Sequence, residues 1–498
     1  MKAVASWCVM RVLLPAELDE LVGVSISGKP DQDGGRLVKD TFHNQISLRS
    51  FMKIKDCSRA SAGKVKATSA TIFLALMLSA PFSYGQQRLS SLDVDRGRVM
   101  LKTIKEDLKK NYYDPRYHGI DLDDRFKTAD ETLKQAGSLG QIFGIVAKVL
   151  LDLDDSHTVF LPPERASRTE YGWQMEMFGD KAYVVAVKPG SDAESKGLKP
   201  GDEIHSVGGV HITRQNMWTF QYLYHALRPQ PGMLLELIKP DGSQQKLEVL
   251  AKVQQLKRFT DLTKGSDIWD LIRESENEDR LHRHRYVELG DDLFIWKMPD
   301  FEISNDRLND LIGKFRNNKA LILDLRGNGG GYESALTHLL GNLFDHDVKV
   351  GDLKGRKDLP PTIAKTAGHG FSGKLIVLID SGSGSAAELF ARVVQLEKRG
   401  IVIGDRSAGA VMRAKLYDHE LGADTIIPYG VMITEADIIM TDGKSLEHTG
   451  VVPDETKIPT PTDLAARRDP VLAYAMALLG VKISSEKAGE FFPIEWRK

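Results

Sequence analysis

The sequence contains little cysteine and almost no net charge, and both shortages exclude classes of protein. Its 498 residues include two cysteines, Cys8 and Cys57, which excludes a disulfide framework and a cysteine-ligated zinc site. The 67 basic and 69 acidic residues leave a formal charge of −2, so no global attraction to nucleic acid or to an anionic membrane is expected. We therefore predict no nucleic-acid partner, no metal and no cofactor.

Long hydrophobic runs are also scarce. The apolar stretch 71–78 with its neighbours is about a dozen residues, too short to span a membrane comfortably. Basic residues precede this stretch and small residues follow it, as in a secretory signal peptide. We predict a signal peptide at 52–86 and export to the periplasm or beyond; an uncleaved membrane anchor is the alternative. Because a signal peptide opens a protein, we expect Met52 to be the true start and 1–51 to be a disposable extension.

The pattern of apolar and turn-forming residues changes along the remaining chain, and these changes predict its domains. Amphipathic helical patterns come first, short strands with Gly/Pro turns follow, and a later region alternates buried strands with helices, which is typical of a layered α/β domain. The predicted divisions are a helical cap at 87–168, a mostly-β domain at 169–253, a charged connector at 254–290, an α/β domain at 291–482 and a C-terminal tail at 483–498.

Two segments suggest other functions that the sequence does not support. RLHRHR at 280–285 contains no carboxylate or cysteine that would complete a metal site and is too short for an extended basic face, so we expect a solvated connector. A predicted buried strand is followed directly by glycines in KALILDLRGNGGG at 319–331. Glycines let the backbone approach a ligand closely. No G-K-[ST] follows and G-x-G-x-x-G is absent, so a phosphate-binding loop is not favoured.

A strand-turn-helix passage makes Ser385 the candidate nucleophile. Residues 375–379 predict a buried strand, Ser381 to Gly384 a tight turn, and helical spacing begins at Ala386. A hydroxyl at a helix N-terminus faces unpaired backbone N–H groups and the positive end of the helix dipole, both of which stabilise an oxyanion. Serine is also a common N-cap, so a purely structural capping role is the alternative.

Several separate motifs resemble those of the tail-specific, or C-terminal processing, serine peptidases, in that family's order. They are LILDLRGNGGG, SGSGSAAE, IVIGDRSAGA and GKSLEHTGVVPD, and the resemblance covers about 93–454. It implies an α/β catalytic domain of the ClpP/crotonase-like layered kind, with an N-terminal helical segment and an inserted mostly-β PDZ domain. In this family the nucleophile stands three residues before the glutamate of S-x-S-A-x-E. That serine is Ser385, and Ser383 is its nearest competitor.

The PDZ resemblance is clearest in AVKPGSDAESKGLKPGDEIHSVGG at 186–209, where a small helix precedes L-x-x-G-D-x-I. PDZ domains bind extended peptide ends along a sheet edge. The loop that binds the peptide carboxylate would lie at Tyr171, Gly172, Trp173 and Gln174, which lack the usual glycine-apolar-glycine form.

The sequence differs from the bacterial members of this family at the residue that acts as general base. Bacterial processing enzymes of the family use a lysine where this chain has Ala410, and Lys415 has no motif support. Another branch, which includes the catalytic core of tricorn protease, uses a serine-histidine pair with a distant glutamate. This chain has Ser156-His157 ahead of the PDZ-like segment and Glu447 after the nucleophile, so the resemblance implies that second arrangement.

In this arrangement Ser385 attacks a carbonyl, His157 transfers the proton, and Glu447 orients the imidazole through Ser156. His157 lies far from Ser385 in sequence, so the helical cap must fold back onto the α/β domain. The oxyanion would be held by backbone N–H groups, those of Gly329 or Gly330 and of Ala386.

The sequence therefore predicts an exported serine endopeptidase that cleaves unfolded or C-terminal polypeptide segments without a cofactor. Its partners are polypeptide substrates, and assembly into a homo-oligomer is left open. The alternatives are a non-catalytic PDZ scaffold that lost the family lysine, and another acyl hydrolase such as an esterase.

Overall fold

The structure is a computed structural model that describes residues 89–256, 277, 280–422 and 426–497. The predicted extension 1–51 and signal peptide 52–86 lie outside the described residues. Along the described ranges, no helix has both the length and the apolar character needed to cross a bilayer.

The central element is a six-stranded sheet in the order β10-β11-β12-β15-β16-β19. All neighbouring strands in it run parallel except β10, which pairs antiparallel with β11 at one edge. Every residue of β12 is buried, as expected for a parallel strand covered on both faces. The strands are β10 (Arg285–Leu289), β11 (Leu293–Lys297), β12 (Ala320–Asp324), β15 (Lys374–Ile379), β16 (Ile401–Gly404) and β19 (Glu455–Thr456).

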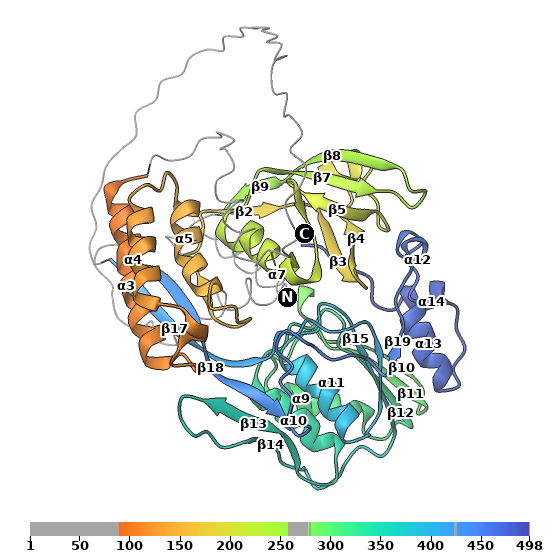
Figure 1. Cartoon of the computed structure of the whole chain (residues 1–498). Coiled ribbons are helices and arrows are strands. Elements are labelled where there is room, and N and C mark those ends of the chain that lie inside the picture. Colours follow the sequence, from red (N-terminus) through yellow and green to blue (C-terminus); the bar gives the residue numbers. More distant parts are fainter. Residues whose placement is uncertain (1–88, 257–276, 278–279, 423–425, 498) are drawn as a thin grey trace, which may run out of the picture. The chain divides into compact units, whose positions relative to one another are not determined.

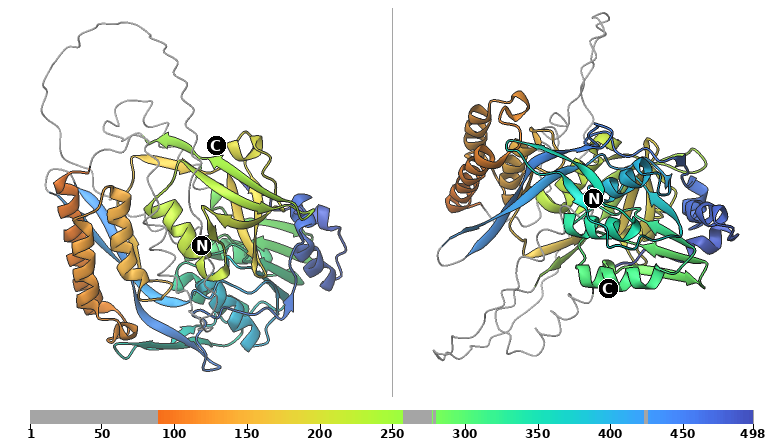
Figure 2. Two further views of the ribbon diagram at one scale, coloured as in Figure 1. Left: turned by 45° about the horizontal axis from the view of Figure 1, so that its top comes forward. Right: turned by 90° about the horizontal axis from the view of Figure 1, so that it is seen from below.

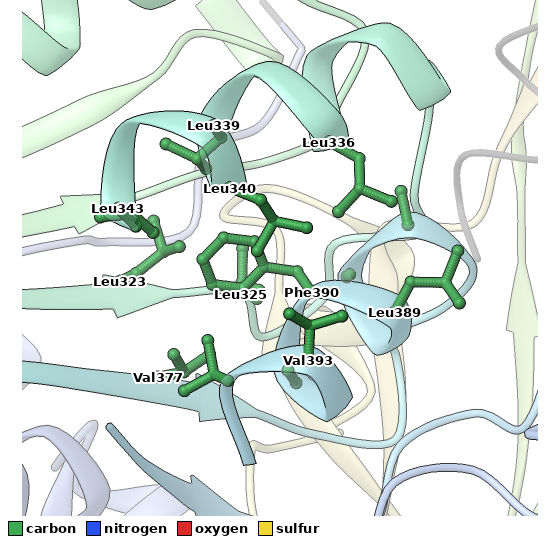
Figure 3. Packing of buried hydrophobic residues seen from close by; sticks show 14 of the residues in the cluster. Leu323, Leu325, Leu336, Leu339, Leu340, Leu343, Val377, Leu389, Phe390 and Val393 are labelled. Atoms are coloured by element: carbon green, nitrogen blue, oxygen red, sulfur yellow. The ribbon is translucent and has the colours of Figure 1, made fainter. Parts of the chain in front are cut away.

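Helices cover both faces of this sheet (Figure 1). Alternate strand residues divide between two apolar clusters, Leu323 and Val377 in one and Ile322 and Ile376 in the other. Figure 3 shows the first cluster, in which Phe390 packs among leucines of α10 and residues of the strands. The helices of the first face are α9 (Asn305–Phe315), α10 (Glu333–Leu343) and α11 (Ala386–Leu396), and those of the second are α13 (Pro470–Leu478) and α14 (Ser485–Gly489).

A second sheet joins the N-terminal helices to the α/β region. Strand β1 pairs antiparallel with β18, Val159 opposite Met432, and β18 also pairs with β13 and β17. The N-terminal helices share one buried cluster with β18, and Figure 2 shows that long strand beside them. The elements are α3 (Ser91–Asn111), η1 (Tyr117–Gly119), α4 (Leu122–Leu133), α5 (Leu139–Leu151), β1 (Val159–Leu161), β13 (Val348–Gly355), β14 (Thr362–Ala364), β17 (Met412–Leu421) and β18 (Ile427–Met440).

The mostly-β segment forms its own sheet, in the order β3-β4-β5-β7-β8 with β6 paired to β5. Strands β2 and β9 pair at its two ends, close to the predicted bounds 169–253. Its identification as a PDZ domain stays a prediction. The elements are β2 (Ser167–Glu170), β3 (Trp173–Phe178), β4 (Lys181–Val187), α6 (Asp192–Ser195), β5 (Glu203–Val207), β6 (Val210–His211), α7 (Arg214–Tyr222), η2 (Leu223–Leu227), β7 (Gly232–Ile238), β8 (Gln244–Leu250) and β9 (Lys252–Gln255).

This segment contacts the catalytic region beside the Ser385 turn. Asp405, which follows β16, accepts hydrogen bonds from the Gly179 amide at 2.8 Å and from Arg214. Ser381 Oγ donates to the Met177 carbonyl at 2.8 Å. The segment is therefore attached to the two loops that flank the nucleophile candidate.

Two sequence predictions were wrong at the end of the connector and at the C-terminus. Residues 285–289 of the predicted connector form strand β10 of the central sheet, and the basic run before it is paired rather than freely solvated: Arg280, Arg283 and Arg285 all form ion pairs with Glu495. The predicted tail contains α14, whose Ala488 is 1 % exposed. Helix α12 (Pro461–Ala465) precedes this C-terminal layer.

Candidate active site

Ser385 lies at a sharp turn between β15 and α11, as the sequence predicted. Its backbone has φ 51° and ψ −119°, a conformation that non-glycine residues rarely adopt. Such strain concentrates at functional sites because the surrounding structure must hold it in place. Here the Ser385 amide donates to the Ala410 carbonyl at 2.8 Å and to Glu388 Oε2 at 3.1 Å. The turn therefore holds the hydroxyl at the helix N-terminus.

Ser383, the competitor, is fully buried and used structurally. Its hydroxyl donates to the Leu325 carbonyl at 2.8 Å and accepts from the Asp380 amide at 3.0 Å. These bonds fix the turn to the end of β12, and they leave Ser385 as the partly exposed serine of the pair.

The structure brings the four predicted side chains into one hydrogen-bonded series. His157 Nε2 lies 3.2 Å from Ser385 Oγ, and His157 Nδ1 lies 2.7 Å from Ser156 Oγ. Ser156 Oγ donates to Glu447 Oε2 at 2.9 Å, and the Ser156 amide donates to Glu447 Oε1 at 2.8 Å. Residues from the start of β1, the N-terminus of α11 and the loop after β18 thus meet.

The hydrogens in this series can be assigned from donor and acceptor capacity. Glu447 as a carboxylate only accepts, so the Ser156 hydroxyl hydrogen is directed to it and the Ser156 oxygen accepts from His157 Nδ1–H. His157 Nε2 is then the unprotonated nitrogen, and it can accept the Ser385 hydroxyl proton. This is the tautomer that a general base requires.

Burial shifts the two titratable groups of the series in opposite directions. It lowers the pKa of His157, although part of the side chain reaches solvent, and the nearby Asp155 charge opposes that shift. It raises the pKa of Glu447, whose hydrogen bonds from the Val411 and Ser156 amides oppose the shift. A neutral imidazole is therefore favoured at neutral pH.

The lysine alternative has no geometric support. The Ala410 backbone contacts Ser385 through its carbonyl, so the family's lysine position is adjacent to the nucleophile but has no side chain that could act. Lys415 is exposed on β17, with Nζ 5.6 Å from the centre of the Tyr417 ring.

The glycine-rich loop after β12 lies against Ser385, and the oxyanion prediction for its amides stays a prediction. The Gly330 amide donates to Asn328 Oδ1 at 2.9 Å, so Gly329 is the better placed of the two predicted glycines. Within the described residues, the amides of Gly329 and Ala386 make no hydrogen bond. A Cβ on Gly330 would lie 2.5 Å from Ser385 Cβ, so this glycine provides space for the nucleophile.

Glu388 is a site residue that sequence reasoning used only as a motif marker. Its carboxylate is fully buried and accepts from the amides of Ser385, Gly409 and Ala410 and from the Ser407 hydroxyl. Burial raises the pKa of Glu388 to about 7, while these hydrogen bonds oppose the shift. The signal in the sequence for a buried carboxylate was a glutamate in the first turn of a largely apolar helix.

The four residues predicted for the PDZ ligand loop lie at the start of β3. Tyr171 is buried and its hydroxyl is engaged twice, donating to the Tyr224 carbonyl at 3.0 Å and accepting from the Gln230 amide at 2.9 Å. Gly172 has φ 73° and its carbonyl accepts from the Lys188 amide. Trp173 and Gln174 pair with β4. Peptide binding by this loop stays a prediction.

The comparisons with known proteins point to peptidases. Residues 295–456 match the model of Peptidase family S41. The crystal structure of mature CPAF aligns with a TM-score of 0.56 and 16 % identity, covering 75 % of this chain and 95 % of that one, which supports the fold.

The relatives are tail-specific and C-terminal processing peptidases, which confirms the resemblance read from the motifs. The tail-specific protease of Haemophilus influenzae is 29 % identical over 277 residues, 51 % of this chain and 36 % of that protein. The chloroplastic C-terminal processing peptidase of Tetradesmus obliquus is 24 % identical over 342 residues, 65 % of this chain and 70 % of that protein. The chain thus matches about a third of the first relative's length.

Proposed function

We propose that the protein is a serine endopeptidase that cleaves unfolded or C-terminal polypeptide segments through an acyl-enzyme. The observation that carries this proposal is the continuous series Ser385, His157, Ser156 and Glu447, each within 3.2 Å of the next. The relatives' names supply the substrate class, since they process polypeptide C-termini.

In the first step Ser385 Oγ attacks the scissile carbonyl carbon while its proton passes to His157 Nε2. The imidazolium that forms is stabilised by Glu447 through the Ser156 hydroxyl. The proton then moves to the leaving amine, the C–N bond breaks, and an ester to Ser385 remains. Water, deprotonated by the same imidazole, hydrolyses that ester.

The amides of Gly329 and Ala386 are the donors available to the tetrahedral oxyanion. One donor comes from the loop after β12 and the other from the first residue of α11, where the helix dipole adds positive potential. Each such donor is worth about 3 kcal/mol of transition-state stabilisation.

Covalent labelling tests the catalytic proposal. A fluorophosphonate should modify wild-type protein at Ser385, whereas Ser385→Ala and His157→Ala should show no label and lose about 10⁴-fold or more of peptide hydrolysis. Lys415→Ala is the matched control and should keep wild-type labelling. A protein that binds peptides but is never labelled would be the non-catalytic scaffold instead. Ester turnover without peptide turnover would indicate another acyl hydrolase.

We also propose that the protein is exported, because 52–86 has the three parts of a signal peptide. Expression in a bacterial host followed by fractionation and N-terminal sequencing tests this. The expected product is an extracytoplasmic chain that begins near 86. Accumulation of the uncleaved chain in the cytoplasm contradicts export, and an uncleaved chain in the membrane fraction indicates an anchor.

A further inference from the structure

Asp155 directly precedes the Ser156-His157 pair, and no step described so far uses it. Its side chain is 5 % exposed, and one oxygen, Oδ1, accepts three hydrogen bonds. The donors are the His157 amide at 2.9 Å, the Thr158 amide at 2.7 Å and Thr434 Oγ1 at 2.7 Å. Asp155 therefore fixes the backbone of the candidate base to β18.

The other carboxylate oxygen, Oδ2, faces the hydroxyl of Tyr112 at the end of α3. Within the described residues both atoms are buried, and neither makes a hydrogen bond of ordinary length. Burial raises the pKa of Tyr112, and the charge of Asp155 and a side-chain hydrogen bond to it raise that pKa further, so the two groups are neighbours. The Tyr112 hydroxyl is thus the donor nearest to Oδ2, and the carboxylate is enclosed by protein.

The charge of Asp155 acts on the imidazole. Burial disfavours protonation of His157, and Asp155 is the group that opposes this effect. Because the Asp155 carboxylate is buried, its field is screened less than it would be in water. The titratable groups around the pair are Tyr112, Tyr113 and Asp114 from the end of α3, Asp437 from β18, and Glu447 and His448 from the loop after it.

We propose that Asp155 is a positioning residue of the reaction, which anchors the His157 backbone to β18 and supplies the fixed negative charge that stabilises the imidazolium. The inference rests on the proposed function, in which His157 is the base. Asp155 touches no reacting atom. It acts through the backbone on one side of the histidine, while Glu447 acts through Ser156 on the other.

Asp155→Asn separates the charge from the anchor. Asparagine keeps an acceptor oxygen for all three donors, and its amide can donate to the Tyr112 hydroxyl. Loss of the charge destabilises the imidazolium, so the acid limb of kcat/KM against pH should move down by about one unit. The plateau of kcat/KM should fall by about tenfold. The rate of fluorophosphonate labelling should show the same shift, and the melting temperature should stay close to the wild-type value.

Three variants serve as controls. Asp154→Asn removes an exposed neighbouring charge at a backbone with φ 53°, which asparagine tolerates, and should leave the acid limb unchanged. Thr434→Val loosens the anchor but keeps the charge, so its acid limb should not move. Asp155→Glu keeps the charge and should also keep the acid limb, whatever it costs in melting temperature.

An Asp155→Asn acid limb at the wild-type position would overturn the proposal, as would a downward shift in Asp155→Glu or an equal shift in Thr434→Val. These outcomes differ from failure of the proposed function, in which wild-type protein is not labelled at Ser385 or His157→Ala keeps its activity.

Discussion

At the scale of single residues, the site depends on pairs of neighbours that look alike in sequence but have different surroundings. Ser383 and Ser385 are two positions apart, yet one hydroxyl is buried in hydrogen bonds and the other faces an imidazole. Gly327 and Gly330 both have positive φ, yet only Gly330 lies against the nucleophile. Residue type alone does not separate such pairs.

The lowered pKa of His157 predicts an acid limb of kcat/KM below the ordinary histidine value of about 6.5. Its sign follows from the base form being active: burial disfavours the imidazolium, so activity is lost only when pH falls further than usual. A pH profile of kcat/KM measures the free-enzyme value. An acid limb above the ordinary histidine value would contradict the burial argument.

Alanine substitutions at Gly330 and Gly327 test whether Gly330 provides space for Ser385. In Gly330→Ala the new Cβ would meet Ser385 Cβ at 2.5 Å, so we expect about 100-fold or greater loss of kcat/KM from the displaced nucleophile. Gly327→Ala has φ +71° but nothing within 4 Å, so it should cost about 1 kcal/mol of unfolding free energy and little activity. Equal activity losses in the two variants would refute the steric explanation.

At the scale of elements, a buried ion cluster fixes the glycine-rich loop to the sheet. Arg326 forms paired hydrogen bonds with Asp324 at the end of β12 and with Asp469 at the start of α13. The Lys297 ammonium adds bonds to Asp324 and to the Arg326 carbonyl. The buried cations hold the pKa of Asp324 below its usual range despite burial. The start of the loop that carries Gly329 is thus anchored to β11, β12 and α13.

Removing the Arg326 guanidinium should lower the stability of the fold. Arg326→Ala leaves Asp469 without a cation and Asp324 with Lys297 alone, so the unfolding free energy should fall by about 3 to 5 kcal/mol in urea titration. Lys319→Ala is the control, because its ion pair with Asp292 is solvent-exposed and should change the unfolding free energy very little. A loss for Arg326→Ala no larger than that of the control would show that the cluster is not stabilising.

At the scale of the whole molecule, the C-terminal segment is a layer of the fold. Phe491 and Phe492 pack against the cluster on the second face of the central sheet, and Glu495 binds arginines at the start of β10. The Asp469 amide donates to the Ser485 carbonyl at 2.8 Å. The segment closes a sheet face that would otherwise be exposed.

Deleting 484–497 should therefore destabilise the whole α/β region. Removing two phenylalanines and uncovering their apolar partners should cost about 3 kcal/mol or more, measured as a lower melting temperature and a lower urea midpoint. Glu495→Gln keeps the layer but weakens its ion pairs, and should change stability much less. Full stability of the truncated chain would mean that these residues form a true tail.

The sequence by itself determined the local elements and the choice of candidate catalytic side chains. Buried runs at 320–324 and 374–379 and the helix from Ala386 were predictable because hydrophobic periodicity reports directly on secondary structure. The motifs selected Ser385, His157, Ser156 and Glu447, and the missing lysine at Ala410 pointed to the histidine.

Only the tertiary structure decided which atoms meet. The pairing of β1 with β18 brings His157 to Ser385, because a register between distant strands depends on the whole core and not on local propensity. The use of the Gly330 amide by Asn328, the burial of Glu388 and the hydrogen bond from Thr434 to Asp155 likewise depend on neighbours far along the chain or on backbone direction. A sequence specifies donors and acceptors, but only the folded core decides which of them find partners.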